Sequence, residues 1–281
     1  MTVRIVTDST SDMSPDMARD LGVSIIPLSV IFGDEVYKEG VDITTDLFYE
    51  KLVTAKVHPT TSAPSVGDFL ATYESLLEGT DEIVSIHLSS KLSATCEVAA
   101  QAARQMAERG AKIEVIDSNL ISLGMTFVVA AAARAAKGGA SIAEIRSIVE
   151  RMIPHVHVYV ALDTLEYLRR GGRIGRARAF LGAVLRVKPI LSLRDGELHP
   201  EERVRTWNMA MDRLFQMATS FPRTKEVAVA YGTNAQDAEM MKRRIEAALP
   251  HATIHLVRIG PVIGVHAGPS LLALGILEGE E

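Results

Sequence analysis

The stretch IVSIHLSSKLSATCEVAAQAARQMAE, residues 83–108, decides the fold because it joins a strand, a hydroxyl-rich turn and a helix. Residues 83–87 are a short apolar run with β-branched side chains, as is typical of a buried strand. Residues 94–108 show the apolar spacing of a helix. A strand that leads through a turn into a helix is the repeating unit of a parallel α/β sheet.

The same alternation runs through the rest of the first half. Further strands are expected at residues 3–6, 24–30 and 113–116, and further helices at 15–21, 66–77, 121–136 and 141–152. Such alternation predicts a parallel sheet covered by helices on both faces. The segments that follow the strands, at residues 7–10, 88–90 and 117–119, should meet at the carboxyl edge of the sheet, where ligands bind.

The second half has a different pattern, and Pro154 marks the change. Strands are expected at residues 155–162, 189–193, 226–231, 253–257 and 261–265, with only a few long helices. Asp195-Gly196 is a hairpin signal. We therefore predict an α/β protein with two domains: an N-terminal parallel-sheet α/β/α domain, residues 1–154, and a C-terminal mixed-sheet α/β domain, residues 155–281.

Composition limits the function classes. With 47% hydrophobic residues the chain is globular, and its net charge of −5 argues against a nucleic-acid partner. The single cysteine, Cys96, excludes an internal disulfide framework and favours a cytoplasmic location. Phosphate-loop, dinucleotide-binding, nucleophile-elbow and compact metal-ligand signatures are missing from the sequence, so no cofactor or metal is expected.

Two hydroxyl-rich segments, HPTTSAPS at residues 58–65 and SSKLSAT at 89–95, are expected where loops run into helices. Hydroxyls at a helix N-terminus can hold a phosphate or a carboxylate. Part of each segment has a purely structural explanation, since Ser65 with Asp68 has capping-box spacing and Ser93 can be a helix cap. Capping leaves the hydroxyls of residues 60–62 unexplained.

Two further clusters each allow two interpretations. Five arginines surround Gly171-Gly172, and they form either a solvated face or a site for phosphate or carboxylate. The stretch GPVIGVHAGP, residues 260–269, contains His266, which is either a structural histidine or one that faces a ligand.

Taken together, the motifs resemble those of the DegV family, and they follow the family's order over almost the whole chain. They are VTDSTSD (residues 6–12), PTTSAPS (59–65), SSKLSAT (89–95), DS (117–118), LRRGGRI (168–174), KPIL (188–191), VRT (204–206) and HAGP (266–269). The resemblance implies two α/β domains with a long-chain fatty acid, such as palmitate, stearate or oleate, in an apolar tunnel between them. It also implies a role as the fatty-acid-binding subunit of a bacterial fatty acid kinase (FakB type), which presents the carboxylate to a separate ATP-dependent kinase subunit.

The resemblance also implies roles for particular residues. Those that match the family's carboxylate site are Thr61, Ser62, Ser93 and His266, and those that match contacts to the kinase or the acyl phosphate are Arg170, Arg173 and Arg205. Departures from the usual pattern, some of which bear on turn geometry or tunnel width, are Ala63, Ala94, Met125 and Ser270. On this interpretation the chain is a carrier and not an enzyme, and transient contact with a membrane is compatible with its ligand.

Three alternatives stay open at the level of sequence. The first is a self-contained hydrolase that uses Ser93 or Ser62 with His266. The second is a subunit like that of dihydroxyacetone kinase, a fold relative of the family, with covalent substrate on His266. The third is a regulatory protein that docks through its arginine cluster.

Overall fold

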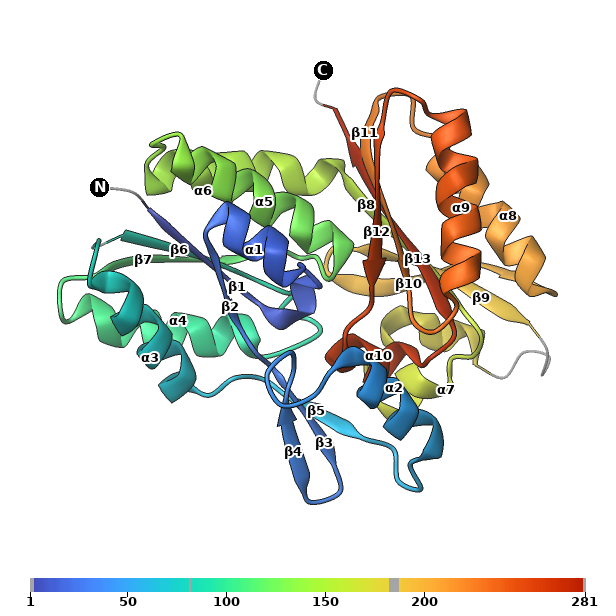
Figure 1. Ribbon diagram of the computed structural model, residues 1–281, viewed down its shortest axis with the longest axis horizontal. Helices are drawn as coiled ribbons and strands as arrows, with labels where there is room; N and C mark the ends of the chain where they lie inside the picture. Colours follow the sequence, from blue (N-terminus) through green and yellow to red (C-terminus); the bar gives the residue numbers. More distant parts are fainter. Residues whose placement is uncertain (1–2, 81, 182–186, 280–281) are drawn as a thin grey trace.

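The computed structural model describes residues 3–80, 82–181 and 187–279 (Figure 1). The outermost residues of the two predicted domains, 1–2 and 280–281, lie outside this part. Two sheets lie side by side, each with its own helices, and a smaller lobe extends below them (Figure 1). The division at residues 154–155 stays a prediction, but the strand that opens the second sheet begins directly after it, at Val156.

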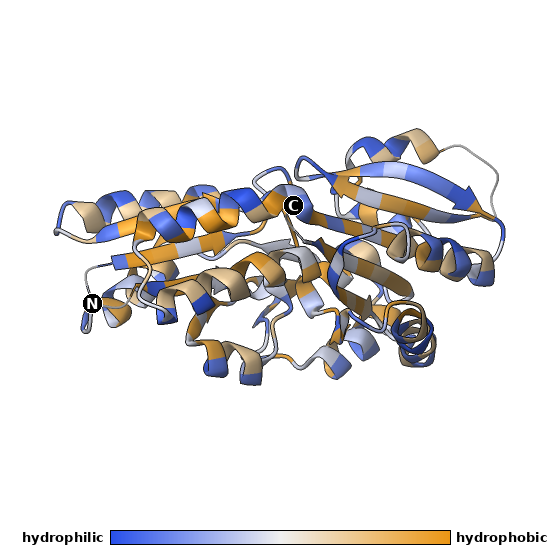
Figure 2. Cartoon of the chain, turned by 90° about the horizontal axis from the view of Figure 1, so that it is seen from above, coloured by the Kyte–Doolittle hydropathy of each residue, from blue (hydrophilic) through white to orange (hydrophobic). Residues whose placement is uncertain are grey.

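The first sheet is parallel, as predicted, with the strand order β2-β1-β6-β7. Its strands are β1 (Arg4–Asp8), β2 (Val23–Ile26), β6 (Glu82–His87) and β7 (Lys112–Asp117). The helices α3 (Val66–Leu77) and α4 (Thr95–Ala107) pack on one face, and α1 (Pro15–Leu21), α5 (Leu123–Lys137) and α6 (Ile142–Met152) on the other. Apolar and polar residues alternate along the helices in Figure 2, as expected for helices with one buried side.

The second sheet is mixed, as predicted, with the order β10-β9-β8-β13-β11-β12. Its strands are β8 (Val156–Leu162), β9 (Lys188–Arg194), β10 (Glu197–Val204), β11 (Thr224–Tyr231), β12 (Thr253–Arg258) and β13 (Leu271–Glu278). The helices α8 (Trp207–Ala218) and α9 (Ala235–Ala248) cover one face, while the other face packs against α5 of the first half. The hairpin at Asp195-Gly196 is confirmed, and both residues have the positive φ, 49° and 76°, that such a turn requires.

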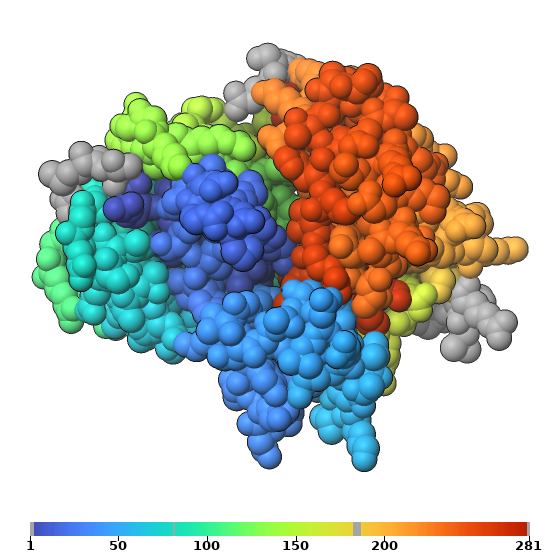
Figure 3. Space-filling view, in the orientation of Figure 1, coloured from blue at the N-terminus to red at the C-terminus, as the bar shows by residue number. Residues whose placement is uncertain are grey.

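The lobe below the sheets comes from the first half of the chain (Figure 3). It contains the helix α2 (Thr45–Thr54) and an antiparallel sheet of β4 (Glu35–Lys38), β3 (Ser29–Phe32) and β5 (Thr60–Ser62). Its core pairs Phe48 and Tyr49 of α2 with Val262 and Val265 of α10 (Pro261–Ala267), a helix of the second half. The lobe thereby connects the two halves.

Three expectations about local structure were wrong. Residues 261–265 belong to helix α10 and not to a strand: Pro261 stands in the first turn, where its missing N–H costs nothing. The expected strand at 24–30 is two strands, β2 and β3, which Pro27 and Leu28 separate and which belong to different sheets. Residues 60–62, which were expected in a loop that runs into a helix, are a strand paired with β3.

Candidate functional site

A cavity lies between the two halves, with about 1040 Å³ of space free of atoms, its open mouth included. Most of its lining is apolar: Leu28, Ala63, Leu88, Leu92, Ile121, Leu123, Val158, Val160, Leu162, Leu168, Leu193, Leu198, Ile259, Val262, Ile263, Ala267, Leu271 and Ala273. The polar members are Thr10, Thr61, Ser62, Ser93, Ser122, Arg173 and His266.

A hydrogen bond between Thr61 of β5 and His266 of α10 joins the lobe to the second half at this cavity. The Thr61 Oγ1 and His266 Nε2 atoms are 2.9 Å apart. Burial, assisted by the charge of Arg173, lowers the pKa of His266 to about 4, so its imidazole is neutral at neutral pH. The other ring nitrogen, Nδ1, is buried and has no hydrogen-bond partner among the described residues.

Gly171 provides the space for this imidazole. A Cβ at residue 171 would lie only 2.1 Å from Nδ1 of His266, so no other residue fits without moving the ring. Gly172 is favoured as glycine for a different reason: its φ is 69°, a left-handed backbone conformation that residues with a Cβ rarely adopt. The packing of His266 against Gly171 joins segments that are almost a hundred residues apart in the sequence.

Ser93 is at the start of helix α4, but it is not the capping residue. Ala94 occupies the cap position, and the Ser93 hydroxyl pairs with the hydroxyl of Thr95 at 2.9 Å. Ser89 is structural, because its hydroxyl donates to the Gly196 carbonyl at 2.8 Å and ties this turn to the β9–β10 hairpin. Ser65 caps α3 with Asp68 in the predicted capping box.

The three arginines proposed as partner contacts have different surroundings. Arg173 is at the cavity, where its Nε donates to the Leu92 carbonyl at 3.1 Å. Arg170, at the end of α7 (Glu166–Arg170), pairs with Glu166 at 2.6 Å. Arg205 is exposed beyond β10, and none of the interactions found among described residues joins it to the cavity. The structure therefore brings Thr61, Ser62, Ser93, His266 and Arg173 together, but not Arg170 or Arg205.

The four departures from the family pattern lie in different places. Met125 is fully buried in α5 and does not line the cavity, whereas Ala63 does. Ala94 is the exposed cap of α4, and the Ser270 carbonyl accepts from the Asp163 N–H at 3.1 Å.

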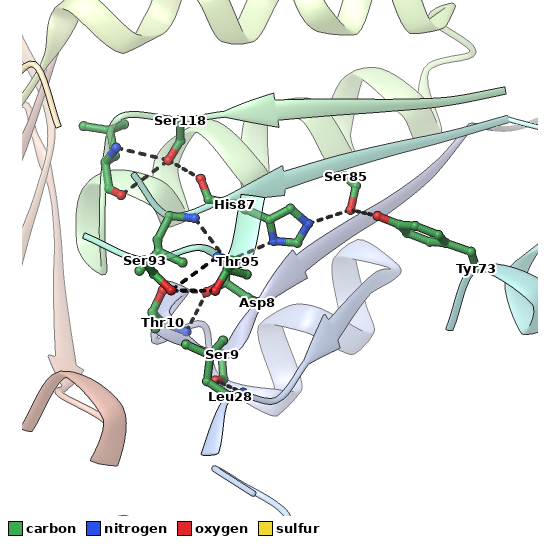
Figure 4. A network of polar contacts seen from close by, with 12 residues as sticks. Asp8, Ser9, Thr10, Leu28, Tyr73, Ser85, His87, Ser93, Thr95 and Ser118 are labelled. Atoms are coloured by element: carbon green, nitrogen blue, oxygen red, sulfur yellow. Dashed lines mark hydrogen bonds and ion pairs between the residues drawn. The ribbon is translucent and has the colours of Figure 1, made fainter. Parts of the chain in front are cut away.

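A buried polar network that the sequence did not suggest lies at the carboxyl edge of the first sheet (Figure 4). Asp8 accepts from Nδ1 of His87 at 3.0 Å, and Nε2 of His87 pairs with the Ser85 hydroxyl at 2.7 Å. Tyr73 of α3 donates to the same hydroxyl at 2.9 Å, so the network joins the ends of β1 and β6 to a helix that covers the sheet. The order Asp–His–Ser is that of a hydrolase triad. All four residues, however, are fully buried, so this serine cannot meet a substrate.

Two acidic side chains hold the N-terminus of α10. Asp12 accepts from the Gly260 N–H at 2.9 Å, and Glu39 accepts from the Val262 N–H at 2.9 Å. Burial raises the pKa of Asp12 to about 7, and burial with the nearby charge of Asp12 raises the pKa of Glu39 to about 8. Since α10 carries His266, these two contacts position the polar end of the cavity.

The fold and this cavity define an α/β protein with a parallel-sheet domain, a mixed-sheet domain and a mostly apolar cavity between them. The chain belongs to the DegV family: the family model described as "Uncharacterised protein, DegV family" matches residues 2–279. A DegV domain-containing protein of Halalkalibacterium halodurans is 37% identical over 276 residues, 97% of each chain.

Solved structures with the same fold include two described as binding fatty acids. A DegV family protein from Thermus thermophilus, described by its fatty-acid binding, has a TM-score of 0.91 and 31% identity over 99% of this chain and 100% of its own. A stearic-acid-binding protein from Eubacterium ventriosum has a TM-score of 0.91 and 28% identity over 98% of each chain. In the described part of our chain, none of the helices is both long and apolar enough to cross a membrane.

Proposed function

We propose that this protein binds one long-chain fatty acid, such as palmitate, stearate or oleate, in the cavity between its halves. The observation that carries the proposal is the shape of the site: an apolar cavity bordered by the hydroxyls of Thr61, Ser62 and Ser93. The Thermus and Eubacterium relatives, described as binding fatty acids, support the same ligand class.

The tail and the head of such a ligand contribute differently to binding. Burial of the acyl chain stabilises the complex by about 0.8 kcal/mol per methylene before ordering costs. A hydrogen bond to the charged carboxylate contributes about 1.5–3 kcal/mol. The tail therefore supplies most of the affinity, and the hydroxyls set the orientation of the head group.

His266 acts as a positioning residue in this arrangement. Because Nδ1 faces Gly171, we assign the proton of the neutral imidazole to Nε2, which then donates to Thr61 Oγ1. The hydroxyl proton of Thr61 then points to the ligand carboxylate. Neutral hydrogen-bond donors of this kind suit a carrier, because they can bind either a carboxylate or an acyl phosphate.

The protein then presents the carboxylate to a separate ATP-dependent fatty acid kinase subunit, and has no catalytic centre or cofactor of its own. Arg170, Arg173 and Arg205 are exposed cations for that subunit or for the acyl phosphate. The geometry disfavours a hydrolase that uses His266, because its Nε2 pairs with a threonine and not a serine. It also disfavours a covalent adduct on His266, because Nδ1 packs against Gly171 and Nε2 is engaged by Thr61.

Native mass spectrometry tests the ligand. Purified protein should carry a mass that matches a long-chain fatty acid, or should take up palmitate or oleate after delipidation. Protein that stays lipid-free when offered both contradicts the proposal. The carrier role requires a second assay, in which the loaded protein yields acyl phosphate only when ATP and a fatty acid kinase subunit are added together.

A further inference from the structure

The cavity has a floor that runs away from the head-group end. Leu162, Val160 and Val158 line it from one face of β8, as alternate residues of a strand do. Leu162 pairs with Leu271, which follows shortly after His266 in the chain, so Leu162 marks the polar end. From there to Val158 is four residues, about 13 Å along the strand.

The first turn of α5 closes the other end of this floor. A Cβ at Gly124 would lie 2.8 Å from Cγ2 of Val158, and a Cβ at Gly275 would lie 2.7 Å from Cβ of Leu123. Gly275 is the register partner of Val158. The two glycines therefore let the helix lie directly on the sheet, with Leu123 seated where the floor ends.

Hydrogen bonds fix this turn in place. The Ser122 N–H donates to the Thr10 carbonyl at 2.8 Å, and the Ser122 hydroxyl donates to Asp12. Leu123 itself is 1% exposed, so it has no room to swing aside without a change in its neighbours.

Behind Leu123 is a second, larger space. It is the cleft between the two halves, and Leu123 lines both the cavity and the cleft. The wall between the cavity and the cleft is equally thin elsewhere. At three other places one residue lines the cavity and the residue before or after it in the chain lines the cleft. The cavity residues are Thr10, Leu28 and Ile259, and their neighbours at the cleft are Ser9, Pro27 and Gly260. The wall at the end of the tunnel is thus one residue thick.

We infer that Leu123 sets the longest acyl chain that this protein accepts, an inference that rests on the proposed fatty-acid binding. The terminal methyl group meets the Leu123 side chain, held by Gly275 and by the first turn of α5. A floor of about 13 Å accommodates about ten methylenes at about 1.3 Å each, and the head-group region holds the rest. Truncation of Leu123 opens the tunnel into the cleft.

Binding of saturated fatty acids from C12 to C22 to delipidated protein tests this inference, with Leu123→Ala against wild type. In wild type, affinity rises about fourfold per added methylene, the equivalent of about 0.8 kcal/mol, and then falls beyond a limiting length. In Leu123→Ala, affinity keeps rising with chain length to about three carbons beyond the limiting length of wild type. Leu123→Val, which is less disruptive to packing, moves the limit by a smaller step in the same direction.

Leu168→Ala is the matched control, because it removes the same atoms from a buried residue of the cavity, on α7. It should weaken all chain lengths alike and leave the limit where it is. An unmoved limit in both Leu123 variants, or an equal shift in the control, overturns the inference. If wild type binds no fatty acid at any length, the proposed function itself fails, which is a different result.

Discussion

Replacing Gly171 with alanine should disturb the head-group site without replacing any residue that lines the cavity. The new Cβ would lie 2.1 Å from Nδ1 of His266, whereas ordinary contact begins at about 3.4 Å, so the ring must move by more than 1 Å. The ring is held between residue 171 and Thr61, and it therefore has to rotate out of the 2.9 Å bond to Thr61.

The expected loss follows from that one bond. Without the imidazole as donor, Thr61 no longer directs its proton to the carboxylate, and a charge-assisted hydrogen bond of about 1.5–3 kcal/mol is lost. Affinity for oleate should fall by about 10- to 150-fold. Affinity for oleyl alcohol, which has the same tail but no carboxylate, should fall much less.

Competition against a fluorescent fatty acid at pH 7.5 measures both constants. Gly67→Ala is the matched control, since residue 67 lies in helix α3 and the nearest atom to its added Cβ is 3.6 Å away. It should bind both ligands as wild type does. The reasoning is refuted if Gly171→Ala binds oleate normally, or if it loses oleate and oleyl alcohol to the same degree.

Three other predictions concern the polar groups. Ser93→Ala and Thr61→Val should each weaken oleate binding by about tenfold while leaving oleyl alcohol nearly unchanged, as measured by the same competition, and equal losses for both ligands would contradict a carboxylate site. The raised pKa of Glu39, about 8 against 4.5 unfolded, means that the folded protein retains a proton that the unfolded chain releases, so the contribution of this group to stability is largest below pH 4.5 and is lost as pH rises toward 8. Between pH 5 and pH 7 this one group should lower the free energy of unfolding, measured in urea, by about 2.5 kcal/mol. Glu39→Gln should reduce the pH dependence of the unfolding free energy by that amount, and an unchanged dependence would exclude the raised pKa. A serine-reactive phosphonate should leave the protein unlabelled. Ser85→Ala should lower the free energy of unfolding by about 1–3 kcal/mol, because His87 and Tyr73 lose a buried partner. If the wild-type protein is labelled and Ser85→Ala is not, Ser85 is a nucleophile and the structural role is wrong.

Local patterns were sufficient where neighbours in sequence decide the structure. The strand–turn–helix unit at residues 83–108, the capping box at Ser65 and the hairpin at Asp195-Gly196 are all confirmed. Each depends on backbone geometry within a few residues, which side-chain type controls directly.

Errors arose where a short apolar run fits two structures. Residues 261–265 have the composition of a strand. Helix α10, however, packs against the lobe through Val262 and Val265 and lines the cavity with Ile263, so apolar residues on both faces remove the periodicity that distinguishes a helix. Residues 60–62 become a strand only because β3, thirty residues earlier, lies beside them.

The sequence by itself determined the two α/β units, the meeting of three strand ends at one edge, and the hydroxyl residues of the candidate site. Those features depend on local propensity and on the chirality of parallel sheets. Only the tertiary structure decided that Thr61 pairs with His266, that Gly171 makes room for the ring, and that Leu123 lies between the cavity and the cleft. These contacts join residues about a hundred or more positions apart, and no local pattern encodes which of them will meet.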